Sequence, residues 1–98
     1  MRFVTLIKFT TQGVSKLKQS PGRAKKFVAQ AKASGANIES LLWTQGRYDG
    51  IILFDAPDAE TAAAITLDLA AKGNVKTETM VAFDSAEMEK VLIKTGKG

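Results

Sequence analysis

The sequence predicts an α+β fold whose elements follow the order β-α-β-β-α-β, with a further helix at the C-terminus. Between residues 42 and 54, apolar runs flank a short link that contains Gly46, which indicates a hairpin. A strand pattern and a helix pattern stand on each side of this hairpin, and two of the strand segments are apolar on both faces. The 98 residues fit a single domain that spans residues 1–98.

The first strand is expected at residues 2–9, where both sets of alternating positions are largely apolar. A strand of this composition belongs in the centre of a sheet that is covered on both faces. Thr10 or Thr11 is then expected to cap a short helix that runs to Lys18.

A longer helix is predicted from Ser20, because serine is a favoured N-cap residue and Pro21 suits the first helical position. Its expected core stripe consists of apolar residues at helical spacing, Ala24, Phe27, Val28 and Ala31. Gly35 suits the left-handed conformation in which many helices end.

The hairpin strands are expected at residues 36–43 and 49–55. The first is interrupted by Glu39 and Ser40, whereas the second is almost entirely apolar. The second strand is therefore predicted to be central and buried on both faces.

The next helix is predicted to begin at Asp58 as the N-cap, with Glu60 favoured in its first turn by the helix dipole. The core face of this helix is expected to carry Ala62, Ile65 and Leu69. Gly73 then ends the helix, and the alternating residues 75–83 form the fourth strand.

The final helix is predicted from Asp84 and Glu87, which have the spacing of a capping box. Its core-facing residues are expected to be Ala86, Met88, Val91 and Leu92. Residues 94–98 are expected to form a frayed tail.

This element order is that of the ferredoxin-like fold, with an antiparallel sheet in the order 4-1-3-2 and helices on one face. The predicted edge strands carry charge, as edge strands commonly do. The charged side chains in question are Glu39, Lys76 and Glu78, with Lys8 near the end of a central strand. Outward positions at the sheet edges are the favoured interpretation, while positions between two sheets would bury them and mark a pocket.

A second apolar sheet face predicts a homodimer. One alternate set of residues 50–54 faces the helices, so the other set must be buried by something else. Leaving two such side chains exposed to solvent loses roughly 3–6 kcal/mol of hydrophobic stabilisation. A second copy packed sheet to sheet through a two-fold interface is the expected cover, which gives a dimeric α/β barrel. The alternative cover is the terminal helix of the same chain.

The composition excludes several kinds of chemistry. The sequence contains no Cys and no His, which excludes disulfides, thiolate nucleophiles and a Ser-His-Asp arrangement within this chain. Any acid–base chemistry must use Asp, Glu, Lys or Tyr. We predict neither a metal site nor a cofactor.

The formal net charge is +4, and the bases are concentrated before Glu39. A solvated, lysine-rich helix face is the favoured interpretation over an anionic partner. Nucleic-acid binding is disfavoured because the predicted third strand offers only Phe54 for base stacking. No apolar run approaches the ~18 residues of a membrane span, and no signal peptide is apparent, so a cytoplasmic protein is expected.

Several segments resemble the GYD-domain family of small bacterial and archaeal proteins. The segments are GRYDGIILFDAPD (46–58), GNVKTETMVAF (73–83), KFTTQGV (8–14) and SPGRAKKF (20–27). The family signature corresponds to Gly46, Tyr48 and Asp49, with Arg47 inserted after the glycine. The resemblance implies membership of the dimeric α/β-barrel group, which includes ligand-binding domains, cofactor-free enzymes and haem enzymes. The absence of His disfavours the haem branch, and the resemblance implies no particular activity.

The candidate ligand-binding residues are Trp43, Gly46, Tyr48 and Asp49, which lie at and beside the hairpin link. Tyr48 and Asp49 offer hydrogen-bonding and acid–base groups, although turn formation alone also accounts for these residue types. The favoured function is a dimeric small-molecule-binding protein. The alternative is a cofactor-independent enzyme, of isomerase or monooxygenase type, that acts on a small apolar or aromatic substrate. No catalytic residue is assigned.

Overall fold

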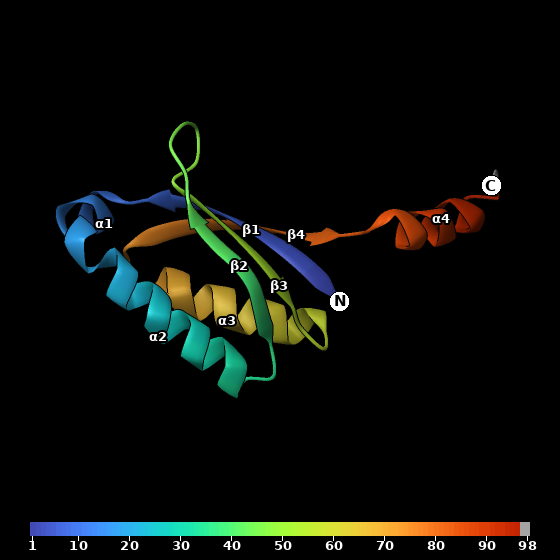
Figure 1. Cartoon of the computed structure of the whole chain (residues 1–98), viewed down its shortest axis with the longest axis horizontal. Helices are drawn as coiled ribbons and strands as arrows, with labels where there is room; N and C mark the ends of the chain where they lie inside the picture. Colours follow the sequence, from blue (N-terminus) through green and yellow to red (C-terminus); the bar gives the residue numbers. More distant parts are fainter. Residues whose placement is uncertain (97–98) are drawn as a thin grey trace.

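The computed structural model describes residues 1–96 and contains a four-stranded antiparallel sheet in the order β2-β3-β1-β4. The central strands are β1 (Arg2–Phe9) and β3 (Gly50–Asp55), and the edges are β2 (Asn37–Trp43) and β4 (Val75–Ala82). Figure 1 shows the hairpin link between β2 and β3 projecting beyond the end of the sheet. The predicted α+β fold class and strand order are confirmed.

The core lies between the sheet and two helices, α2 (Ser20–Ala33) and α3 (Ala59–Ala71), which cover one face of the sheet (Figure 1). Alternate residues of the central strands point into it because side chains of a strand alternate between faces. The buried apolar residues include Phe3, Ile7, Phe27, Ala31, Ile52, Phe54, Ala62 and Ile65. The rings of Phe3 and Phe54 stack with their centroids 5.4 Å apart, so the two central strands also interlock through their side chains.

The short helix after β1 ends earlier than predicted. Thr10 caps α1 (Thr11–Ser15) by accepting a hydrogen bond from the Gly13 amide, and a 3-10 turn, η1 (Leu17–Gln19), follows. The Lys16 carbonyl accepts a 3.0 Å hydrogen bond from the Gln19 amide. This bond spans three residues, so the chain tightens here instead of continuing as an α-helix.

The start of α2 also differs from the prediction. Gln19 occupies the N-cap position without a side-chain capping bond, and the Ser20 hydroxyl instead accepts a hydrogen bond from the Trp43 indole. Within the predicted stripe, Val28 is 39% exposed, because the core contacts of α2 are made by Phe27 and Ala31. Gly35 ends the helix as expected, with a φ of 90°.

The terminal helix α4 (Ser85–Lys94) has the predicted capping box but not the predicted packing. Asp84 and Glu87 bond reciprocally to each other's backbone amides. No residue of α4 is buried, and Figure 1 shows the helix extending away from the sheet. The prediction that Ala86, Met88, Val91 and Leu92 face the core is therefore wrong. The reason is that α2 and α3 already close the core of this chain. Of the expected tail, Lys94 belongs to α4, and residues 97–98 lie outside the described part.

The sheet face opposite α2 and α3, which we call the open face, has no cover within residues 1–96. Its half-buried or exposed apolar side chains are Val4, Leu6, Leu42, Ile51, Leu53 and Met80. Because α4 points elsewhere, the terminal helix does not shield this apolar surface.

The charged residues of β4, Lys76 and Glu78, are exposed on an edge strand, and their side chains lie on the open face of the sheet. Glu78 stands directly opposite Leu6, and Lys76 stands directly opposite Lys8. Directly opposite residues of an antiparallel pair share one face of the sheet. The alternation of side chains along β4 therefore sets the face on which Lys76 and Glu78 lie, and the edge position of the strand does not.

Candidate functional site

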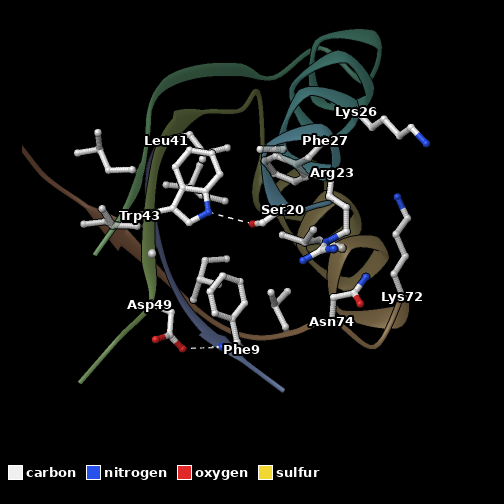
Figure 2. Close-up of a pocket in the computed structure, with 18 residues that line it drawn as sticks. Phe9, Ser20, Arg23, Lys26, Phe27, Leu41, Trp43, Asp49, Lys72 and Asn74 are labelled. Atoms are coloured by element: carbon white, nitrogen blue, oxygen red, sulfur yellow. Dashed lines mark hydrogen bonds between the residues drawn. The ribbon is translucent and has the colours of Figure 1, made fainter. Parts of the chain in front are cut away.

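A pocket of about 250 Å³ lies between the helix-covered face of the sheet and α2. Figure 2 shows lining side chains that come from β1, β2 and α2, together with side chains just before β3 and between α3 and β4. Most of the wall is apolar, including Phe9, Phe27, Leu41, Ile52, Leu69 and Val75. The volume falls below the ~300–1,000 Å³ that is usual for drug-sized ligands, so the pocket suits a smaller molecule.

Trp43 forms part of the pocket wall at the end of β2. It pairs with Gly50, where a Cβ atom would come within 3.1 Å of the Leu42 carbonyl oxygen and 3.4 Å of Ile7 Cβ. The indole nitrogen donates a 2.9 Å hydrogen bond to the Ser20 hydroxyl at the start of α2 (Figure 2). This bond ties the edge strand to the helix and fixes the orientation of the ring, although 49% of Trp43 remains exposed.

Asp49 lines the same pocket and also fastens the hairpin link to β1. Its Oδ2 accepts a 2.8 Å hydrogen bond from the Phe9 amide (Figure 2). Its own amide donates to the Ile7 carbonyl, and its carbonyl accepts from the Thr44 amide. These bonds occupy the backbone groups and one carboxylate oxygen, so they assign Asp49 a structural role in addition to its place at the pocket.

Tyr48 points to the other side of the sheet. Its hydroxyl donates a 2.9 Å hydrogen bond to Glu78 Oε2, and it lies with Leu6 and Lys8 in a shallow polar depression on the open face. The bond to Glu78, strengthened by the nearby negative charge, raises the pKa of the Tyr48 hydroxyl. Gly46 is exposed and has a φ of 143°, a backbone conformation that glycine adopts more readily than other residues.

The structure thus divides the predicted site. Trp43 and Asp49 meet at the pocket, whereas Gly46 and Tyr48 lie outside it. Sequence reasoning missed Arg23, which lines the pocket from α2. Its Nη1 donates a 2.9 Å hydrogen bond to the Lys16 carbonyl, and its buried Nη2 has no hydrogen-bond partner. The available signal was its position beside Ala24 on the predicted stripe, but its charge favoured a surface position.

Two neighbouring carboxyl groups, Glu39 and Asp55, lie at the other end of the open face. Glu39 stands at the irregularity where the pairing of β2 with β3 shifts between Ile38 and Ser40. The neighbouring Asp55 carboxyl can accept a hydrogen bond from protonated Glu39, and this interaction, reinforced by partial desolvation and repulsion, raises the pKa of Glu39. Arg2 opposes the shift.

Residues 1–96 contain no group of three or more Asp or Glu side chains placed to hold a metal ion. No helix among them has the length and apolar character to cross a bilayer.

The fold and pocket define a small α+β domain with one covered and one open sheet face. The chain matches the GYD domain family over residues 3–92 and belongs to that family. It is also 31% identical over 87 residues to a protein of Thermus thermophilus named "Glutamine synthetase and cystathionine beta-lyase binding protein". The match covers 88% of this chain and 92% of that protein.

Proposed function

We propose that this protein is a homodimer that binds a small molecule in the pocket between its sheet and α2. The observation that carries the proposal is the pocket itself, in which a mostly apolar wall surrounds a few polar groups. Small-molecule sites commonly have this composition. The bond between Trp43 and Ser20 holds the wall in place before any ligand arrives, which lowers the entropic cost of binding.

The dimer is supported by the uncovered aliphatic side chains of the open face, because such patches are usually interaction surfaces. Charged side chains lie at both ends of this apolar surface, Lys8 and Lys76 at one end and Arg2 and Asp55 at the other.

The dimer is tested by native mass spectrometry and light scattering of Leu53→Asp, with Leu67→Asp as the control. Leu53 lies on the open face, whereas Leu67 is 68% exposed on α3. We expect the wild-type protein and Leu67→Asp to be dimers and Leu53→Asp to be monomeric. A monomeric wild-type protein, or a dimeric Leu53→Asp, would contradict the sheet-to-sheet interface.

Ligand binding is tested by following Trp43, the single tryptophan of the chain, while small neutral, anionic and cationic aromatic compounds are added. We expect at least one class to change the indole fluorescence and to shift amide resonances of pocket residues. If no class does so at millimolar concentration, the small-molecule proposal fails.

A second candidate function is the binding of an enzyme, and the name of the Thermus thermophilus relative favours it. The exposed apolar positions of α4, Met88, Leu92 and Ile93, offer this chain a contact surface separate from the pocket. The test is light scattering of this protein mixed with glutamine synthetase and with cystathionine beta-lyase from its own source. A complex that is lost in Ile93→Asp and kept in Leu67→Asp would support this function, and the absence of any complex would exclude these two partners.

A further inference from the structure

We infer that the pocket binds a small carboxylate with an apolar body, and that the guanidinium of Arg23 binds the carboxylate group. This inference rests on the proposed small-molecule function and adds the chemical class of the ligand. It begins from an arginine nitrogen that is buried at the pocket and has no hydrogen-bond partner.

The position of Arg23 explains why its nitrogen is available. The Nη1 atom is held by a 2.9 Å hydrogen bond to the Lys16 carbonyl, which lies where α1 gives way to the 3-10 turn. Figure 2 shows the guanidinium directed into the space between α2 and the sheet. Its Nη2 carries N–H donors that no described residue accepts. A buried donor without a partner is costly, and a carboxylate matches the planar arrangement of arginine donors.

The other charged residues around the pocket neither accept a hydrogen bond from Arg23 nor direct a second positive charge into the pocket. Lys72 donates its hydrogen bond to Gln30 and lies 3.9 Å from the Asp68 carboxylate on the outer side of α3. Figure 2 shows the ammonium group of Lys26 directed away from the pocket. Asp49 is the acidic residue of the lining, and its Oδ2 accepts from the Phe9 amide at another part of the wall. Arg23 is therefore the cationic group presented to a ligand.

The remaining wall specifies the body of the ligand. Phe9, Leu41, Ile52 and Val75 supply aromatic and aliphatic surface, and Trp43 closes one side with a ring fixed by Ser20. The volume of about 250 Å³ restricts the ligand to a compact molecule. An aromatic ring on a short chain that ends in a carboxylate meets these requirements, so 3-phenylpropionate is a suitable probe.

The test compares three probes of nearly equal shape: 3-phenylpropionate, its neutral amide 3-phenylpropionamide and the cation 3-phenylpropylamine. Each probe is titrated into the purified wild-type protein while Trp43 fluorescence and backbone amide resonances are recorded. Because a charge-assisted hydrogen bond exceeds the ~1.4 kcal/mol that corresponds to a tenfold ratio, we expect the carboxylate to bind about tenfold or more tightly than the amide.

The same titrations on Arg23→Gln and Arg23→Lys assign this preference to the residue. We expect Arg23→Gln to bind the carboxylate and the amide about equally, and Arg23→Lys to keep part of the preference. The control is Lys32→Gln, which removes one positive charge from the same helix outside the pocket lining and should bind as the wild type does. Circular dichroism shows whether each variant folds.

The outcomes distinguish a failure of the carboxylate inference from a failure of the small-molecule function. If the amide or the amine binds the wild-type pocket as tightly as the carboxylate, the anion inference is overturned while the small-molecule function stands. A carboxylate preference that survives in folded Arg23→Gln also overturns it. If none of the probes binds, and the broader set of compounds fails as well, the proposed function and this inference fall together. Should Arg23→Gln not fold, the probe comparison on the wild-type protein still decides.

Discussion

Replacing Asp49 tests whether its carboxylate stabilises the fold by holding the hairpin link against β1. The Phe9 amide donates a 2.8 Å, partly buried hydrogen bond to Asp49 Oδ2, and Asp49→Ala leaves that amide without its partner. A hydrogen bond to a charged group contributes about 1.5–3 kcal/mol, and a neutral one about 0.5–1.5 kcal/mol. Because the site is partly solvated, we expect Asp49→Ala to lower the free energy of unfolding by about 1.5–2 kcal/mol.

Asp49→Asn separates the hydrogen bond from the charge, since its amide oxygen can accept the same N–H. We expect this variant to lose roughly 1 kcal/mol or less, the difference between the charged and neutral bonds. Urea unfolding at one fixed protein concentration measures both values, and the melting temperature of Asp49→Ala should fall by roughly 6 °C or more.

The matched control is Asp68→Ala, which removes an exposed carboxylate that lies 3.9 Å from Lys72 on α3. Surface changes of this kind shift stability by no more than about 0.5 kcal/mol. If Asp49→Ala costs no more than Asp68→Ala, the bond to Phe9 does not hold the link in solution and the structural role is refuted.

Three further perturbations follow from the geometry. A methyl group on Gly13 would collide with the Asn74 carbonyl, so Gly13→Ala should destabilise the fold by about 2 kcal/mol or more. The control is Gly22→Ala, whose added methyl group meets no neighbour and should change stability by at most about 1 kcal/mol. Urea unfolding measures the free energy of unfolding of both variants. The Thr61 hydroxyl and amide lower the pKa of Asp58 below its ordinary 3.8, so its stabilising effect is complete above that value and is lost as the pH falls through the lowered pKa. Asp58→Asn keeps the cap and should flatten the loss of melting temperature between about pH 5 and pH 2. Ser20→Ala removes the acceptor of the indole N–H and should raise quenching of tryptophan fluorescence by acrylamide.

The sheet was predictable because its signals are local. The strand at residues 2–9 and the almost uninterrupted apolar run at 50–54 each identify a central strand before any contact is known. The caps at Asp58 and Asp84 were equally predictable, since a capping bond joins residues three apart. The packing of α4 was not, because the amphipathic pattern of a helix shows that it has an apolar face but not which surface covers that face.

The pocket was only partly predictable for a related reason. Trp43 and Asp49 stand out in sequence because they flank a turn, and the structure does bring both to the pocket wall. Arg23 comes from another element, and its Nη1 donates a hydrogen bond to the Lys16 carbonyl. Such a contact depends on where α1 ends, which the sequence predicts at Lys18 and the structure places at Ser15.

Tyr48 and Asp49 are adjacent in the chain but serve opposite faces of the sheet. Tyr48 bonds to Glu78 on the open face, while Asp49 bonds to Phe9 beside the pocket. Both residues lie in the link before β3 begins at Gly50, and their side chains diverge there, so the shared position in the family signature does not imply a shared site. Substitutions at Tyr48 therefore report on the open face and those at Asp49 on the pocket. Their effects on stability should add to within about 0.5 kcal/mol in a double variant, and a larger discrepancy would mean that the hairpin link responds as one unit.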